Sequence, residues 1–164
     1  MNRPELAKDT DAREILALYR AAAAQAKRTG HSHWDENYPS EETVRSDLAG
    51  GWLYVWREDG KIAAAITLLP AEEMEAEGVA WTPVRRAAEA CRFCLSPGLQ
   101  GKGRAKAYFL GAVDLLRAQG VDALRYTCAK DNIAAYRLYT GIGHSLVGET
   151  TWRGIEFYAF ESLL

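Results

Sequence analysis

Apolar residues recur every three or four positions in two long stretches of the chain, which is the spacing of one face of an α-helix. The first predicted helix begins at a cap residue, Thr10 or Asp11, and runs to about Lys27. The second follows a glycine-rich loop and ends at Gly120. Its apolar stripe repeats at helical intervals and consists of Ala105, Tyr108, Phe109, Ala112, Val113 and Leu116.

Two shorter helices are predicted from their capping residues. Ser40 begins a segment that resembles a capping box, and its helix is expected to end near Gly50. Asn132 is expected to cap a helix that continues through Tyr139, after which glycines end it. Both helices therefore have a start signal and a stop signal in the sequence.

Short runs rich in apolar, β-branched and aromatic residues predict the strands. "WLYVWRE" and "KIAAAITLL" should form a hairpin, because Asp59-Gly60 between them is a strong two-residue turn. "CRFCLS" and "ALRYTCA" are further strands, and "SLVGETT" with "IEFYAFESL" makes a closing antiparallel pair that turns near Arg153-Gly154. Residues 70–89 form an excursion between strands, and a strand within residues 1–9 is poorly marked.

This order of elements predicts a mixed α/β fold. The strand, helix and strand around residues 91–128 should form a right-handed parallel crossover, whereas the flanking hairpins favour antiparallel pairing. A chain of 164 residues fits a single domain, residues 1–164, that can bury a core without disulfides.

Charge and cysteine usage narrow the function. A formal net charge of -2 argues against a general nucleic-acid binder, so any anion site must be local. No window approaches the roughly 20 apolar residues of a membrane span, and no apolar signal core is found. Three cysteines without framework spacing favour reduced thiols in a cytoplasmic protein. Cys91-x-x-Cys94 lacks a second pair and His31-x-His33 lacks a further ligand, so no metal is expected.

The stretch "LSPGLQGKGRAK", residues 95–106, carries three glycines, three cations and no acid. It lies between a predicted strand and the long helix. The first turn of a helix has N–H groups without internal partners, and the helix dipole adds positive charge there. Glycines keep side chains away from these N–H groups. The stretch therefore predicts a cradle for a phosphate or pyrophosphate.

Two common phosphate motifs do not fit this stretch. Gly98 and Gly103 have the glycine spacing of a P-loop, but Arg104-Ala105 stand where Lys-Ser/Thr belong, so no hydroxyl reaches Mg²⁺. The dinucleotide pattern can start at Gly101 but meets Lys106 at its third glycine.

A third pattern fits. Gln100 to Ala105 match Q/R-x-x-G-x-G/A, which resembles the pyrophosphate loop of the GCN5-related N-acetyltransferase (GNAT) superfamily. "DNIAAYRLYTGIGH" resembles the later family motif, with Asn132, Ala135 and Tyr139 at the family positions and His144 where the family usually has Phe. The resemblance covers nearly the whole chain, and residues 34–39 also resemble a bacterial GNAT subgroup.

The resemblance implies the GNAT fold: a mixed, mostly antiparallel central sheet with a parallel, splayed strand pair, flanked by helices. It also implies an N-acetyltransferase that moves an acetyl group from acetyl-CoA to a primary amine of a small molecule or peptide. Main-chain groups would bind the coenzyme: its pantetheine at Phe93, Cys94 and Leu95, and its pyrophosphate at Gln100, Gly101, Lys102, Gly103, Arg104 and Ala105. The side chains of Lys102, Arg104 and Lys106 either meet the 3′-phosphate or are solvated.

Tyr139 matches the family tyrosine that protonates the departing thiolate. A reference pKa of about 10 suits that role at neutral pH; the alternative is a half-buried packing residue. Asn132 would bond the coenzyme, cap its helix, or do both. The sequence does not identify a general base, because the nearby acid, Glu89, stands only at the beginning of its strand.

The acceptor pocket is expected to use the first loop and the excursion, with Trp34, Tyr38 and Trp81 as walls or as packing residues. Asp35 and Glu36 could attract a cationic amine. The sequence leaves open the amine, the acyl length and the oligomeric state, including a homodimer. Two other hypotheses stay open: a non-catalytic CoA- or nucleotide-binding sensor, and a protein-interaction module.

Overall fold

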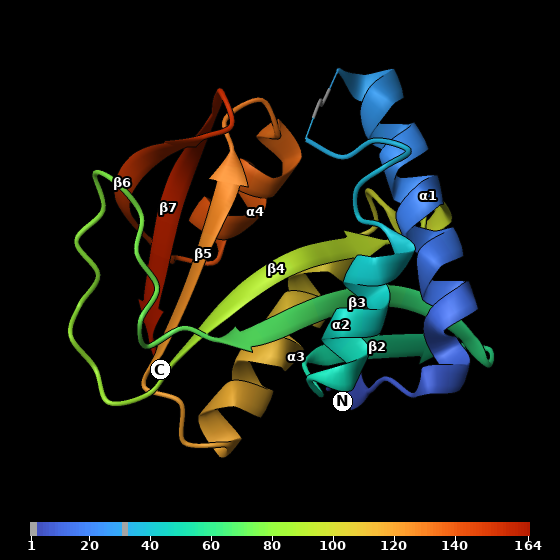
Figure 1. The fold of residues 1–164 in the computed structure, drawn as a ribbon, viewed down its shortest axis with the longest axis horizontal. Coiled ribbons are helices and arrows are strands. Elements are labelled where there is room, and N and C mark those ends of the chain that lie inside the picture. The colour runs from blue at the N-terminus through green and yellow to red at the C-terminus, as the bar shows by residue number, and fades with distance from the viewer. Residues whose placement is uncertain (1–2, 31–32) are drawn as a thin grey trace. The chain divides into compact units, whose positions relative to one another are not determined.

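The computed structural model describes residues 3–30 and 33–164 (Figure 1). His31 of the His-x-His pair lies outside the described residues. The helices, including two short 3₁₀ turns marked η, are η1 (Asp9–Asp11), α1 (Ala12–Thr29), α2 (Glu41–Ala49), η2 (Pro97–Leu99), α3 (Arg104–Ala118) and α4 (Ile133–Gly141). The strands are β1 (Glu5–Leu6), β2 (Leu53–Glu58), β3 (Lys61–Pro70), β4 (Ala87–Leu95), β5 (Ala123–Ala129), β6 (Ser145–Trp152) and β7 (Ile155–Leu163).

The strands of the described residues form one mixed sheet in the order β1-β2-β3-β4-β5-β7-β6. The β4–β5 pair is parallel, with residue pairs from Ala87 and Ala123 to Glu89 and Arg125. The pairs β1–β2, β2–β3, β5–β7 and β6–β7 are antiparallel. This topology confirms the predicted mixed, mostly antiparallel sheet with a parallel pair and flanking helices.

The chain divides into two compact units, each with a core of its own. The first contains Met1–Leu68 and Arg92–Ala112, and the second contains Leu69–Cys91 and Val113–Leu164. The glycine loop before α3 therefore belongs to the first unit, whereas α4 belongs to the second.

The first unit buries apolar side chains on both faces of its strands. Adjacent residues of a strand point to opposite faces. Val55 accordingly joins a core cluster with Ile15 of α1 and Val44 of α2, all three with no exposed surface. Trp56 stacks instead on Tyr108 of α3, with 5.1 Å between ring centroids. Burial of each such side chain contributes about 1.5–3 kcal/mol, so the core holds helices against both faces.

A buried ion pair ties α2 to β4 within the first unit. Asp47 is only 3% exposed and accepts two hydrogen bonds of 2.8 Å from the guanidinium of Arg92. The hydroxyl of Thr67 donates a third, at 2.7 Å. Arg92 has a φ of 51°, a left-handed conformation that costs free energy for a residue with a side chain. The pair with Asp47 therefore offsets a strained backbone inside a strand.

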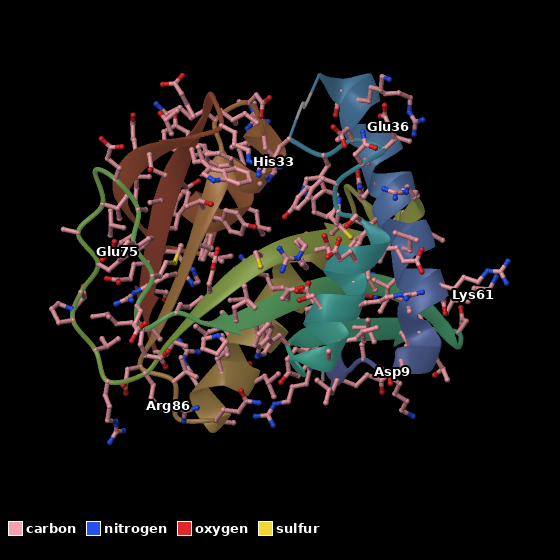
Figure 2. The ribbon with its side chains drawn as sticks, in the orientation of Figure 1. Asp9, His33, Glu36, Lys61, Glu75 and Arg86 are labelled. Carbon is pink, nitrogen blue, oxygen red and sulfur yellow. The ribbon has the colours of Figure 1, made fainter. Side chains whose placement is uncertain are left out.

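The β2–β3 hairpin has the turn that its sequence predicts. Asp59 and Gly60 have φ values of 49° and 77°. Positive φ at both central residues matches the twist of a two-residue hairpin, and Asp-Gly tolerates it at low cost. Lys61, which follows the turn, points away from the ribbon (Figure 2).

The second unit packs α4 against β5 and β7 through aromatic rings. Tyr126 of β5 stacks on Phe160 of β7 with centroids 5.5 Å apart, and Tyr139 of α4 lies 4.5 Å from Tyr126. Tyr139 also contacts Phe160 at 5.6 Å. This three-ring contact fixes the face of α4 that carries Tyr139.

The excursion between β3 and β4 is anchored by a buried charge network of the second unit. Arg125 donates hydrogen bonds to the carbonyls of Ala71 at 2.8 Å and Thr82 at 2.7 Å. Glu161 lies 3.3 Å from Arg125 and accepts from the amide of Thr82 at 3.1 Å. Both charged side chains are at most 5% exposed, so each is paired and hydrogen-bonded as burial requires.

Two details of the predicted elements are wrong. The strand predicted from Cys91 begins at Ala87, because pairing with β5 makes a strand of residues that are poor strand formers by themselves. Asp11 precedes α1 but makes no side-chain capping bond. Its carboxylate accepts from the amide of Lys8 and pairs with Arg57 at 2.8 Å. Burial alone would raise the pKa of Asp11, but these two partners lower it below its usual value.

We expect Asp47→Ala to destabilise the protein by about 3 kcal/mol, because it leaves the Arg92 guanidinium buried without its counter-ion. Denaturant unfolding measures this as a lower midpoint at an unchanged slope. Asp114→Ala is the control, since it removes only an exposed pair with Arg117 and should leave the midpoint almost unchanged. Equal midpoints for the two variants would contradict this role of the pair.

Candidate active site

The loop before α3 is built around two glycines in the left-handed region. Gly101 and Gly103 have φ values of 74° and 72°. A Cβ atom added at either position would meet no heavy atom within 4 Å. Residues from Gln100 to Arg104 are exposed. The loop therefore leaves open space directly beside its main chain, where a side chain would otherwise stand.

The main-chain amides at the start of α3 lack partners inside the helix. The amide of Ala107 donates to the carbonyl of Gly103 at 3.5 Å. The amides of Arg104, Ala105 and Lys106 precede this bond and belong to the first turn, whose N–H groups have no intrahelical acceptor. The helix dipole concentrates positive charge at the same place. Such a terminus suits a phosphate group.

One of the three loop cations has a partner in the protein. Nη1 of Arg104 lies 2.8 Å from Oε1 of Glu58, the last residue of β2. Tyr108 donates its hydroxyl hydrogen bond to the same carboxylate oxygen. Lys102 and Lys106 are exposed. The loop thus presents its charge unevenly, with Arg104 already engaged and two lysines facing solvent.

The strand that leads into the loop uses its side chains for the core. Phe93 packs against Trp56 and Phe109, with ring centroids 6.1 and 5.5 Å apart. Cys94 and Leu95 are buried. Burial raises the pKa of the Cys94 thiol well above its usual value, so this cysteine is not a thiolate nucleophile at neutral pH. Any role of these residues toward a ligand falls to their main chain.

Asn132 immediately precedes α4 and Tyr139 lies on it, both in the second unit. The side-chain oxygen of Asn132 accepts from the amide of Ala135 at 3.1 Å, which confirms it as the helix cap. Tyr139 is 8% exposed, and burial followed by the influence of Cys128 raises its pKa well above the usual value. Its hydroxyl therefore stays protonated through neutral pH, as a proton donor must.

His144 occupies the position where the sequence departs from the GNAT pattern, and it has a defined partner. Its Nδ1 lies 2.7 Å from the hydroxyl of Tyr126. Its amide donates to the carbonyl of Tyr139 at 3.3 Å. Burial, followed by the charge of Arg117, lowers the pKa of His144. The imidazole is therefore neutral at pH 7, and Nδ1 can accept a hydrogen bond from the Tyr126 hydroxyl.

Trp34 and Tyr38 lie in the loop between α1 and α2 of the first unit, where Glu36 is exposed (Figure 2). Trp34 packs edge-on against Tyr19 at 5.4 Å and joins the core cluster that contains Cys94. The hydroxyl of Tyr38 accepts from Arg92 at 3.2 Å. Both aromatic residues therefore have packing or hydrogen-bonding partners in the protein itself.

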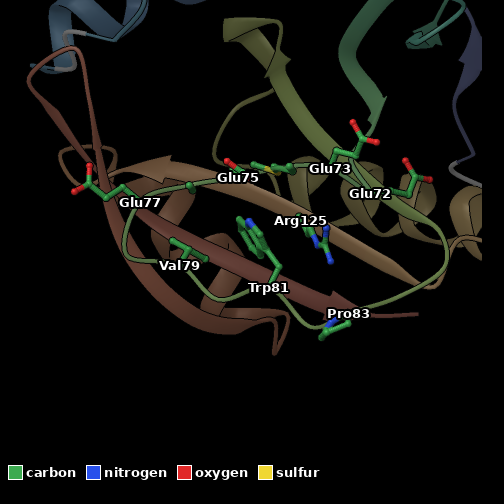
Figure 3. Close-up of a pocket in the computed structure, with 10 residues that line it drawn as sticks. Glu72, Glu73, Glu75, Glu77, Val79, Trp81, Pro83 and Arg125 are labelled. Atoms are coloured by element: carbon green, nitrogen blue, oxygen red, sulfur yellow. The ribbon is translucent and has the colours of Figure 1, made fainter.

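Trp81 lies apart from these residues in sequence and belongs to the second unit. It lines a pocket of about 860 Å³ together with Arg125, whose guanidinium lies 5.6 Å from its ring (Figure 3). Four glutamates of the excursion also line this pocket: Glu72, Glu73, Glu75 and Glu77. The lining of the pocket thus combines four exposed carboxylates with one indole ring.

Among residues 3–30 and 33–164, no group of three or more His, Cys, Asp or Glu side chains could hold a metal ion. In the same residues no helix is both long and apolar enough to cross a membrane. Sequence reasoning did not find Glu58, Arg92 or the Tyr126–His144 pair. Only His144 carried a signal, as a departure from a motif.

The sequence model of one family, described as the acetyltransferase (GNAT) family, matches residues 14–144. The chain belongs to this family. GNAT membership makes it an acetyl-CoA-dependent N-acetyltransferase. No curated protein is matched by the sequence.

Three solved acetyltransferase structures share the fold. An acetyltransferase of the GNAT family from Streptococcus agalactiae 2603 is 21% identical, with a TM-score of 0.84 over 99% of this chain and 95% of its own. A ribosomal-protein-alanine N-acetyltransferase from Brucella melitensis is 16% identical, with a TM-score of 0.72 over 98% and 99%. YncA, an acetyltransferase from Salmonella typhimurium solved with its cofactor acetyl-CoA, is 16% identical, with a TM-score of 0.69 over 98% and 92%.

We expect the stability of the protein to fall as the pH drops below about 6.5, the ordinary pKa of histidine. The folded pKa of His144 is lowered, so the unfolded chain binds this proton at a higher pH than the folded protein. The stabilisation is complete above pH 6.5 and is lost as the pH falls towards the folded pKa. Denaturant midpoints measured between pH 5 and 8 test this expectation.

His144→Phe should remove this component of the pH dependence. Tyr126→Phe is the control, because it removes the hydroxyl partner but keeps the imidazole. An unchanged pH dependence in His144→Phe would assign the effect to other groups.

Proposed function

We propose that this N-acetyltransferase moves the acetyl group of acetyl-CoA to a primary amine of a small molecule or a peptide by direct attack. One observation carries the proposal: Gly101 and Gly103 open the main chain at the start of α3 to an anion. The acetyl-CoA in the Salmonella relative and the ribosomal-protein alanine named for the Brucella relative support a CoA donor and an amine acceptor.

The coenzyme is held mainly by main-chain groups. The main chain from Gln100 to Ala105 binds the pyrophosphate. The amides of Arg104 and Ala105, in the first turn of α3, carry partial positive charge without an intrahelical acceptor. The main chain of Phe93, Cys94 and Leu95 pairs with pantetheine, and Asn132 adds a contact beside its capping bond. Residues 1–164 act as a single acetyltransferase domain in this proposal.

Tyr139 is the general acid. The neutral amine nitrogen attacks the thioester carbonyl carbon, a C–N bond forms and the C–S bond breaks. The CoA sulfur leaves as a thiolate and takes the Tyr139 hydroxyl proton, while the amine gives up its own proton to water or a carbonyl. Solvent then returns a proton to Tyr139 before the next turnover. A raised pKa keeps Tyr139 protonated until the thiolate forms.

The acceptor amine is bound by Trp34, Tyr38 and Trp81. Exposed carboxylates accompany these residues, with Asp35 and Glu36 beside the first two and four glutamates around Trp81. This favours an acceptor with positive charge.

A thiol-release screen tests the function. The purified protein is mixed with acetyl-CoA and panels of amino acids, polyamines, aminoglycosides and peptides, and free CoA is measured. Amine-dependent release supports the proposal. Tight CoA binding without release on any panel would favour the sensor hypothesis instead.

We expect Tyr139→Phe to lower kcat by about 100-fold or more, because the thiolate then leaves without its proton donor. The Kd for CoA should stay within about two-fold of the wild type, since the ring and its packing remain. Tyr136→Phe is the control, because Tyr136 lies on the same helix and packs on Tyr158 at 4.9 Å. Equal kcat for both variants would exclude Tyr139 as the acid.

A further inference from the structure

Glu58 places one carboxylate against the first two turns of α3. Its Oε1 lies 2.8 Å from Nη1 of Arg104, the first residue of the helix. It also accepts the hydroxyl hydrogen bond of Tyr108, four residues later on the same face. Burial, followed by this contact with Glu58, raises the pKa of Tyr108 to about 12. One side chain from the hairpin therefore meets the helix beside the proposed anion site.

The two contacts of Glu58 differ in how firmly they are held. Tyr108 is 3% exposed and stacked on Trp56, so its hydroxyl cannot move far. The Arg104 side chain is 48% exposed, and that of Glu58 is 30% exposed. An exposed guanidinium exchanges partners at little cost, because a surface ion pair contributes at most about 1 kcal/mol.

An exchange of partners by Arg104 changes the charge that the loop presents to an anion. Lys102, Arg104 and Lys106 supply three positive charges, and no acid stands between residues 95 and 106. Glu58 is thus an acid that the fold, rather than the local sequence, brings to this loop. It neutralises one of the three cations and adds a negative charge next to a site for anions.

We propose that Glu58 determines the affinity for the coenzyme by competing with its phosphate groups for Arg104. This inference rests on the proposed function, because it assumes that the glycine loop binds CoA. In the free protein Arg104 is paired with Glu58. Bound CoA draws Arg104 to a phosphate, and the carboxylate takes it back when CoA leaves. Glu58 therefore weakens binding of CoA and speeds its release.

Glu58→Gln tests the proposal with little structural change. The amide oxygen of glutamine still accepts from Tyr108, but the negative charge is gone. We expect the Kd for CoA, measured by calorimetry at low salt, to fall about three- to ten-fold, as removal of one charge near the ligand predicts. The difference should shrink as ionic strength rises to about 0.5 M, because salt screens the interaction.

Two further variants separate the exchange from a general charge effect. Glu5→Gln is the control. It removes the carboxylate of Glu5 in β1, which pairs with Arg57, the residue before Glu58 in β2. In an Arg104→Gln background, Glu58→Gln should change the Kd no more than this control does. Melting curves of each variant verify that it is folded.

The outcomes distinguish this inference from the proposed function. If the wild type binds no CoA, the proposed function is wrong, and the inference falls with it. If the wild type binds CoA but Glu58→Gln binds it equally or more weakly, the inference alone is overturned. If Glu58→Gln increases the affinity for CoA just as much in the Arg104→Gln background, the inference is also overturned. Arg104 would then not be the group for which Glu58 and the phosphates compete.

Discussion

The main-chain amides at the start of α3 need an acceptor that the helix cannot supply. Gly101 and Gly103 make these amides accessible to an external acceptor, because their left-handed conformation and missing side chains leave the amides open to solvent. A phosphate group satisfies several amides at once and also interacts favourably with the helix dipole. In the proposed function, binding of the coenzyme depends on this single arrangement, which needs no particular side chain in the loop.

The rest of the first unit keeps the start of α3 in place. Trp56 and Phe93 pack against Tyr108 and Phe109, which are the second turn of the helix. Glu58 holds the helix from the end of the hairpin. An anion site made of main-chain groups requires such a rigid base, because amides that moved apart could not contact one ligand together. The packed side chains thus support the neighbouring main chain that would bind the anion.

Local patterns in the sequence predicted most of the fold. The 3.6-residue period predicted α1 and α3, Asp59-Gly60 predicted the hairpin, and Asn132 predicted the start of α4. These features depend on neighbours within a few positions. The start of β4 was missed, because Ala87 becomes part of a strand only through its pairing with Ala123.

The candidate site was predictable where it consists of a motif and not where it consists of a contact. The glycine loop and Tyr139 are motif positions. The pairs Asp47–Arg92, Glu58–Arg104 and Tyr126–His144 join residues 45, 46 and 18 positions apart, and no periodicity connects such distant positions. Arg92 illustrates the limit, since its left-handed backbone is stabilised by a helix that lies far away in the sequence.

The most direct test of the loop as the anion site is a crystal structure of the protein with bound acetyl-CoA. We expect diphosphate oxygens within about 2.7–3.2 Å of the main-chain nitrogens between Gly101 and Ala105, the range of normal hydrogen bonds. A coenzyme whose diphosphate lies on another segment, with these amides bonded only to water, would contradict the assignment.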